Sequence, residues 1–314
     1  MSEKIIKGKC LYTPAGAARE YAAIGCNFFR GCPFQCDYCY NRKGVVAPVM
    51  GIDHVVLEDC FTKKERRPMK YRKDDISDET YAMIVFKKEL ERNIDYFRKT
   101  GIFFSFSTDP MLKDTHHLTW RAANVAVQNG VPVTILTKCA ETFNFLVDWF
   151  GKDVDFHKGC KELIAFGFTL TGRDDLEEGA KKHYSSNKER IEAMKKLKNQ
   201  GYKVWASIEP IVDFSSSLKM IRESLPYCDH YKIGLMSKRS KTLPPYTIEG
   251  CKDFVFDVDH ELLSAYSEKR TGKLIKAYWK ESVRRFVSDD PFTMQIINNS
   301  PASVSRDWSI FTNK

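Results

Sequence analysis

Three cysteines lie within eight residues near the start of the chain. Residues 30–40 read RGCPFQCDYCY, so Cys32, Cys36 and Cys39 follow the spacing CxxxCxxC. Three thiolates this close together can bind a catalytic zinc, a structural zinc that has a fourth ligand, or an iron–sulfur cluster. Structural zinc sites usually combine two CxxC or Cys/His pairs, and Cys26 is the only nearby candidate for a fourth ligand. The pattern therefore favours a [4Fe–4S] cluster, which leaves one iron open when only three cysteines bind it.

The composition is that of a folded protein without a membrane span. The chain has 314 residues, 43% of them hydrophobic and 29% charged, which is enough for one large α/β domain with a sizeable core. No run of eighteen apolar residues is present, and the first residues, MSEKIIKGKC, lack the apolar segment of a secretory signal. We therefore expect a cytoplasmic protein whose other cysteines stay reduced and behave as small buried hydrophobic residues.

Short apolar runs alternate with amphipathic segments along most of the chain. Such runs are typical of strands that are buried on both faces of a sheet. They occupy residues 23–29, 102–107, 132–137, 163–170, 203–208 and 230–235. Polar N-caps and closing glycines or prolines indicate helices at residues 77–101, 119–130, 142–151, 186–201 and 215–226. Six strand–helix units in series predict parallel strands with right-handed crossovers, hence an α/β fold built as a partial (β/α)6 TIM-like barrel.

Polar side chains follow these runs at the points where the strands should end. Thr108 and Asp109 follow the second run, Lys138 the third, Thr169 the fourth and Glu209 the fifth. The carboxyl ends of barrel strands form the active site, so we expect these residues to share one site. Two simpler interpretations stay open, because Asp before Pro favours a turn and a lysine at a strand end can be solvated. No GxGxxG motif follows an early strand, so a dinucleotide-binding sheet is not indicated.

The segment CPFQCDYC resembles the signature of the radical S-adenosylmethionine (radical SAM) enzymes, a CxxxCxφC loop after the first strand of a partial barrel. The segment LYTPAGAAREYAAIGCNFFRGCPFQCDYCY, followed by STDP, LTK, TLT and EP, resembles the spore photoproduct lyase branch over residues 10–240. This resemblance implies a [4Fe–4S] cluster whose open iron binds S-adenosylmethionine. It also implies reductive cleavage of that cofactor to a 5′-deoxyadenosyl radical, with an electron donor such as flavodoxin or ferredoxin.

The resemblance implies roles for the strand-end residues as well. Thr108 and Asp109 would lie near the amino-acid part of S-adenosylmethionine, and Lys138 would pair with its carboxylate. Thr169 would contact the ribose or sulfonium region, and Glu209 would belong to the same cofactor site. These assignments extend the predicted site from the cysteine loop to the ends of four strands.

Four further residues concern the cofactor and the fate of the substrate radical. The resemblance implies that Tyr38 packs near the adenine, although a plain core tyrosine would have the same sequence. The lyase branch has a cysteine as hydrogen donor where this chain has Phe106, so Phe106 is expected to shape the substrate pocket instead. Tyr40 and Cys139 are the remaining candidate donors in the chain, and Cys139 is equally consistent with a buried thiol.

Basic residues are concentrated in two parts of the chain, whose formal net charge is +9. Residues 63–73 carry seven basic side chains and one acid, and they include Arg66, Arg67 and Lys70 as candidate substrate contacts. Near the C-terminus four basic residues recur at helical spacing: Lys273, Lys276, Lys280 and Arg284. Both clusters are consistent with phosphate contacts or with solvated surfaces.

These observations together predict a radical SAM enzyme with a bulky substrate, most directly a nucleic-acid base or lesion in DNA repair or modification. The alternatives are a radical SAM enzyme that modifies peptides, proteins or small molecules, and a non-enzymatic metal-cluster module that binds nucleic acid. Polar strand ends have no purpose in such a module. The barrel is expected over residues 1–240, with a helical extension over 241–314 packed on it, in a monomer without a membrane partner.

Overall fold

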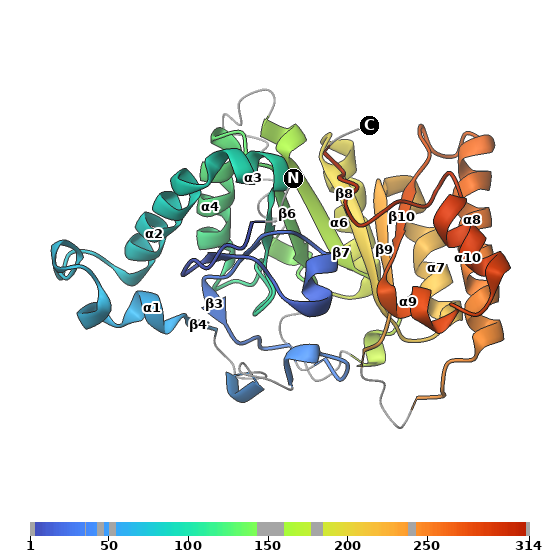
Figure 1. The fold of residues 1–314 in the computed structure, drawn as a ribbon, viewed down its shortest axis with the longest axis horizontal. Coiled ribbons are helices and arrows are strands. Elements are labelled where there is room, and N and C mark those ends of the chain that lie inside the picture. Colours follow the sequence, from blue (N-terminus) through green and yellow to red (C-terminus); the bar gives the residue numbers. More distant parts are fainter. Residues whose placement is uncertain are drawn as a thin grey trace.

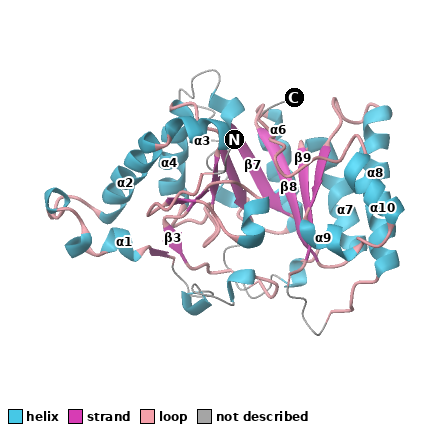
Figure 2. Cartoon of the chain, in the orientation of Figure 1, coloured by secondary structure: helices cyan, strands magenta, loops and turns pink. Residues whose placement is uncertain are grey.

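The computed structural model describes residues 4–34, 36–42, 47–49, 55–142, 160–176, 185–237 and 243–311. Its centre is an eight-stranded sheet in the order β1-β2-β5-β6-β7-β8-β9-β10 (Figures 1 and 2). The strands are β1 (Leu11–Tyr12), β2 (Gly25–Cys26), β5 (Ile102–Phe104), β6 (Val133–Thr137), β7 (Ile164–Thr169), β8 (Lys203–Ile211), β9 (His230–Leu235) and β10 (Lys276–Trp279). Neighbours from β2 to β10 run parallel, and β1 pairs antiparallel with β2. A separate two-stranded sheet joins β3 (Phe29–Arg30) to β4 (Val56–Leu57).

Helices cover one face of the sheet, with α4, α6 and α7 in contact with β6, β7 and β8 (Figure 1). The α-helices are α1 (Asp59–Thr62), α2 (Asp78–Arg92), α3 (Ile94–Thr100), α4 (His116–Gln128), α6 (Asn187–Asn199), α7 (Phe214–Ser224), α8 (Ile248–Ser267), α9 (Glu281–Phe286) and α10 (Pro291–Asn299). Several of these helices begin with a polar side chain that accepts a hydrogen bond from a backbone amide of the first turn. Ser77 caps α2, Ser186 and Glu189 form a capping box at α6, and the Asp213 side chain accepts the amide of Ser216 at α7.

The predicted alternation of strands and helices is confirmed, with differences at the boundaries. The first apolar run divides into β2 and β3, and the predicted helix 77–101 divides into α2 and α3 at Asn93, whose φ of −135° interrupts the helix. Helix α4 begins at His116, earlier than expected. Most of the predicted helix 142–151 lies outside the described residues.

The predicted basic helix face near the C-terminus is wrong. Residues 276–279 form β10, which extends the sheet beyond β9. Lys276 donates from Nζ to the carbonyl of Pro301 at 2.6 Å, and Lys280 is buried. Lys273 pairs with Asp229 at 2.9 Å. The C-terminal part therefore contributes a strand as well as helices. Within the described ranges, no helix is long and apolar enough to cross a membrane.

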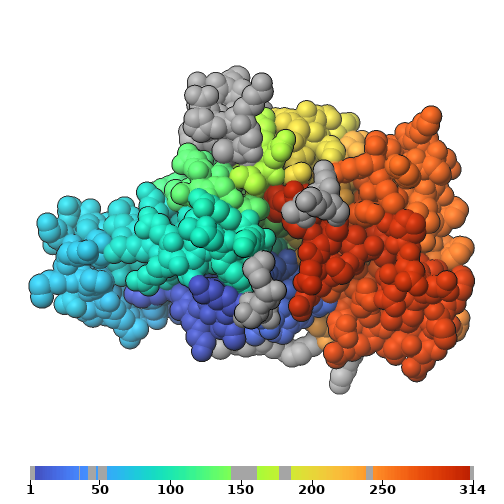
Figure 3. All heavy atoms as spheres, turned by 45° about the horizontal axis from the view of Figure 1, so that its top comes forward, coloured from blue at the N-terminus to red at the C-terminus, as the bar shows by residue number. Residues whose placement is uncertain are grey.

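Residues from both the early and the late parts of the chain pack around a small buried cluster on the central strands of the sheet. Phe103, Ala165 and Trp205 form a buried cluster there, and Gly167 leaves room for the Trp205 ring, because a Cβ would stand 2.1 Å from it. The residues packed around this cluster are Tyr21, Ala22, Phe106, Leu136, Ile310 and Phe311. In Figure 3 the red C-terminal part lies against both the blue and the teal parts of the chain, in agreement with these contacts.

Candidate active site

The cysteine loop leaves strand β3 through a sharp turn at Gly31. Its φ of 88° lies in the left-handed region, where a side chain would be strained. Cys32 and Cys36 are buried and Cys39 is half-buried, and the Cys39 amide donates to the Cys36 carbonyl at 3.1 Å. Cys26, the alternative fourth ligand, is fully buried on β2 and belongs to the core. The three predicted cluster ligands thus come from one short loop.

Lys138 reaches the cysteine loop from the carboxyl end of β6. Its Nζ lies 3.3 Å from the Cys36 Sγ and 4.6 Å from the centroid of the Tyr38 ring. A cation at this distance stabilises a thiolate, which is the form in which cysteine binds metals. The two parts of the predicted site are therefore in direct contact.

Asp109 fixes the backbone from which Lys138 extends. Its buried carboxylate accepts hydrogen bonds from Thr137 Oγ1 at 2.6 Å and from the amides of Lys138 and Met111 at 2.8 and 2.9 Å. Burial raises the pKa of Asp109, and the hydrogen bonds from Thr137, Lys138 and Met111 lower it. The Asp109 carboxylate is thus already engaged in hydrogen bonds within the protein. Thr108 differs, because its buried Oγ1 has no hydrogen-bond partner within the described part of the chain.

A cavity of about 390 Å³ lies between the cysteine loop and the strand ends. Seven predicted site residues line it: Tyr38, Cys39, Tyr40, Phe106, Lys138, Thr169 and Glu209. Thr108, Asp109 and Cys139 are not among its lining residues, although Thr108 and Asp109 were expected to face it. The cavity has the size of a small-molecule or cofactor site.

Phe106 forms an apolar wall of this cavity. Its ring stacks on Phe103 at 4.6 Å between centroids, and its amide donates to Asn27 Oδ1 at 3.0 Å. The Tyr40 hydroxyl donates to the Phe106 carbonyl at 2.7 Å, so Tyr40 crosses from the cysteine loop to this wall. Cys139 is buried, and burial raises the pKa of its thiol.

A buried polar network that the sequence analysis missed borders the same cavity. Lys280 donates from Nζ to Glu209 Oε2 at 2.6 Å, lies 3.7 Å from Glu20 Oε2, and stands 4.3 Å from the centroid of the Tyr21 ring. The Tyr21 hydroxyl donates to Glu209 and shares a hydrogen bond with Ser207 Oγ at 2.7 Å. Glu209 is therefore engaged by two protein donors.

One sequence signal could have indicated Lys280. It directly follows the last residue of strand β10, as Lys138 directly follows the last residue of strand β6. Tyr21 carries no comparable signal, because its partners come from β8 and from the end of β10, far away in sequence.

The basic stretch at residues 63–73 lies apart from the cavity, beside α1 and α2 (Figure 1). Arg66 and Lys70 are exposed there. Arg67 is not a surface residue, since it is 1% exposed and its guanidinium donates to Asp78 and to the Phe61 carbonyl. The structure thus keeps two of these three predicted contacts available to a partner.

The chemistry of the donors in the cysteine loop fits a cluster with an open position: three thiols in one short loop, a lysine beside one of them, and a cavity on the side of the third. Across the described ranges, no three or more His, Cys, Asp or Glu side chains converge as ligands of one metal ion. The thiolates of an iron–sulfur cluster bind it through its several irons, whereas the ligands of zinc must meet at one centre.

Comparison with known proteins gives one family match. The model of the radical SAM superfamily matches residues 26–215. No curated protein matches the chain. Among solved structures, spore photoproduct lyase complexed with dinucleoside spore photoproduct is 13% identical with a TM-score of 0.44, and 88% of this chain covers 63% of that one. SuiB of Streptococcus suis bound to S-adenosylmethionine is 10% identical with a TM-score of 0.49, at coverages of 87% and 54%. The chain thus spans less than two thirds of either structure.

Proposed function

The chain belongs to the radical SAM superfamily, and on that premise we propose that it abstracts a hydrogen atom from a nucleic-acid base or lesion held in the cavity of about 390 Å³. It is an enzyme of a family whose cofactors are a [4Fe–4S] cluster and S-adenosylmethionine. When bound, these cofactors supply a 5′-deoxyadenosyl radical that removes hydrogen from the substrate. The observation that carries the proposal is that the cysteine loop and the strand ends line one cavity.

Cys32, Cys36 and Cys39 would hold the cluster. The Lys138 Nζ lies 3.3 Å from the Cys36 Sγ, so it would lie beside the cluster as well as beside the cavity. Cys39 also lines the cavity, so the loop brings its third thiol to the place where a cofactor and a substrate would meet.

Tyr38, Lys138 and Thr169 would contact S-adenosylmethionine from the cavity wall. Thr108 Oγ1 is buried outside the lining of this cavity, so we assign it no contact with the cofactor. Asp109 acts through Lys138, whose amide it holds at 2.8 Å, and is therefore a positioning residue. Glu209 shapes the same wall while it is held by Lys280 and Tyr21.

Aromatic side chains favour a flat substrate. Tyr21, Tyr40, Phe103 and Phe106 line one cavity, and base–aromatic stacking is worth about 1–3 kcal/mol per base. A base in a duplex would have to leave the stack to enter, and the net charge of +9 favours the phosphates around it. No returned hydrogen is assigned to Cys139, because that thiol is buried outside the cavity lining.

Anaerobic reconstitution tests this function. The protein with iron, sulfide, dithionite and S-adenosylmethionine is expected to be brown, to contain about four irons per chain, and to release 5′-deoxyadenosine. Single-stranded or duplex DNA should change the rate of release or become modified. The triple variant Cys32→Ala, Cys36→Ala, Cys39→Ala should be colourless, and Cys60→Ala is the matched control that keeps the colour.

The outcomes separate the candidates. A colourless native protein with one tightly held zinc would refute the cluster. Release of 5′-deoxyadenosine that responds to peptides or small molecules and never to DNA would refute the nucleic-acid substrate while leaving the radical chemistry intact.

A further inference from the structure

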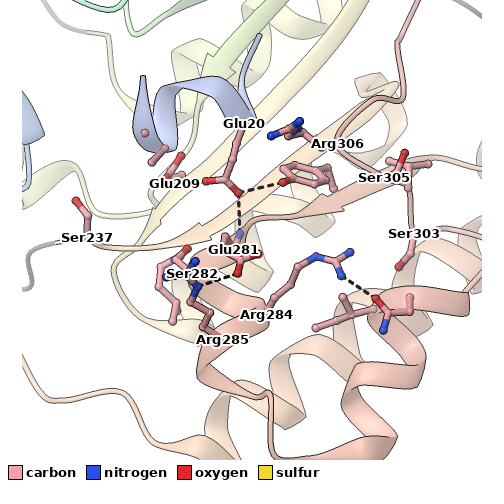
Figure 4. A pocket seen from close by; sticks show the side chains of 17 residues that line it. Glu20, Glu209, Ser237, Glu281, Ser282, Arg284, Arg285, Ser303, Ser305 and Arg306 are labelled. Carbon is pink, nitrogen blue, oxygen red and sulfur yellow. Dashed lines mark hydrogen bonds and ion pairs between the residues drawn. The ribbon is translucent and has the colours of Figure 1, made fainter. Parts of the chain in front are cut away.

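A second cavity, of about 910 Å³, adjoins the first on the side of the C-terminal part. The two cavities share Ala17, Glu209 and Ser237 in their walls, so they lie next to each other. Figure 4 shows this second cavity with Glu20 and Glu209 on one side and Arg284, Arg285 and Arg306 around it. The function proposed above makes no use of this space.

The cavity is built by segments that the sheet holds in place. The segment at residues 302–306 runs along β10, where the Ala277 amide donates to the Ala302 carbonyl at 2.8 Å and the Val304 amide donates to the Ala277 carbonyl at 3.0 Å. Helix α9, which directly follows β10, provides the opposite wall. Its arginines and Arg306 thus approach one space from two anchored segments.

The acids of this cavity already have partners. Glu20 Oε1 accepts the Tyr278 hydroxyl at 3.0 Å and the Glu281 amide at 2.7 Å, and its Oε2 lies 3.7 Å from the Lys280 Nζ. Glu209 accepts Lys280 at 2.6 Å. The Glu281 carboxylate accepts Arg285 Nε at 2.7 Å. Lys280 and Arg285 therefore balance two of these three negative charges.

Arg284 is fixed by neutral groups and keeps its charge for a ligand. Its Nε donates to the Trp279 carbonyl at 2.9 Å and its Nη1 donates to Asn298 Oδ1 at 2.7 Å. Among the residues whose placement is described, no acid forms an ion pair with Arg284, and Arg306 has only Asp307 at 3.8 Å. Arg284 and Arg306 both line this cavity, one from helix α9 and the other from the segment beside β10 (Figure 4).

We propose that this second cavity binds a phosphate group of the substrate, with Arg284 and Arg306 as its principal contacts, while the base occupies the first cavity. A single arginine saturates a planar carboxylate through two parallel hydrogen bonds, whereas a tetrahedral phosphate has further oxygens for a second guanidinium. The inference rests on the proposed function, because it requires that the base attached to this phosphate lies in the first cavity, beside the cysteine loop. It restricts the substrate to a nucleotide or a nucleic-acid segment.

The test measures binding to the reconstituted holoenzyme with S-adenosylmethionine present and reductant absent, by calorimetry at fixed ionic strength. The probes are thymidine, thymidine 5′-monophosphate and the dinucleotide of thymidine joined by a phosphodiester. The wild type should bind at least one phosphate-bearing probe about tenfold or more tightly than thymidine, as expected for hydrogen bonds to a charged group. Arg284→Gln and Arg306→Gln should each remove most of this preference.

Arg98→Gln is the matched control, since Arg98 is also half-exposed and donates to a backbone carbonyl, that of Asn129 at 3.0 Å, on distant helix α3. It should keep the full phosphate preference. If Arg284→Gln fails to fold, as judged by circular dichroism, Arg306→Gln decides. Preference for the monophosphate identifies a free nucleotide as the source of the phosphate, and preference for the dinucleotide identifies a nucleic acid.

Three results would overturn the inference. The wild type could bind all three probes equally, or the Arg98→Gln variant could lose as much preference as Arg284→Gln. An acidic peptide, measured as a fourth probe, could bind as tightly as the phosphate-bearing probes. Release of 5′-deoxyadenosine is measured on the same preparations. Intact release without a phosphate preference removes this inference alone, whereas a wild type that releases none removes the proposed function.

Discussion

Replacing Lys280 by methionine tests the buried network beside the cavity. The Lys280 side chain is 2% exposed, while those of its partners Glu209 and Glu20 are 21% and 12% exposed. Lys280→Met keeps most of the volume and removes the charge, so two largely buried carboxylates lose their cation. The aromatic face of Tyr21, 4.3 Å from the ammonium, loses it as well.

The expected loss of stability is large because the charges left behind are buried. Removing one partner of a buried ion pair typically lowers the free energy of unfolding by about 3–5 kcal/mol. Converting Glu209 to glutamine in the same chain should restore part of that loss, because the amide carries no charge. We expect a coupling energy of roughly 1–3 kcal/mol between the two substitutions.

Urea denaturation followed by circular dichroism under anaerobic conditions measures both quantities. Lys219→Met is the matched control, since Lys219 is 70% exposed and its pair with Glu223 spans 3.8 Å. Its loss should stay below about 1 kcal/mol. A Lys280→Met variant no less stable than Lys219→Met, or one that Glu209→Gln does not improve, would show that the network does not stabilise the fold.

Three further predictions concern single residues. Lys138→Ala should weaken S-adenosylmethionine binding about tenfold or more in calorimetry, because a charge-assisted hydrogen bond is lost, and an unchanged affinity would remove Lys138 from the cofactor site. Cys139→Ala should keep substantial turnover with cluster content unchanged, since the thiol lies outside the cavity lining, and complete loss of turnover would contradict this. Burial and the charge of Lys280 lower the pKa of Lys232 to about 7, so above pH 7 the unfolded chain binds more protons there and stability should rise toward pH 10. Relative to Lys232→Met, unfolding curves should show a slope of at most about 1.4 kcal/mol per pH unit in that window, and identical pH profiles would refute the shift.

The local patterns predicted much of the fold and of the loop chemistry. Strands β5 to β9 appear where apolar runs predicted them, because strands buried on both faces need continuous apolar residues. Strand β10 was missed for a geometric reason. Lys276 and Lys280 are four residues apart, a spacing that places side chains on one side of a helix and equally on one face of a strand.

Long-range partners account for the errors at the site. In the sequence Arg67 is not distinguishable from the other basic residues of its stretch. Only the folded structure brings Asp78 and the Phe61 carbonyl to its guanidinium. The contact of Tyr21 with Glu209 and Lys280 likewise joins distant parts of the sequence. Composition and periodicity describe neighbours along the chain, so they predict the strand ends and not the partners that meet there.

The closure of the sheet interior has a kinetic consequence. Tyr21 and Phe311 pack around the cluster of Phe103 and Trp205 from positions about 290 residues apart, a separation that makes this contact entropically costly to form early in folding. The parallel strands between them can assemble from units that are neighbours in sequence before Tyr21 and Phe311 pack around this cluster. A refolding chain should therefore recover its far-ultraviolet circular dichroism before Trp205 is shielded from a soluble fluorescence quencher.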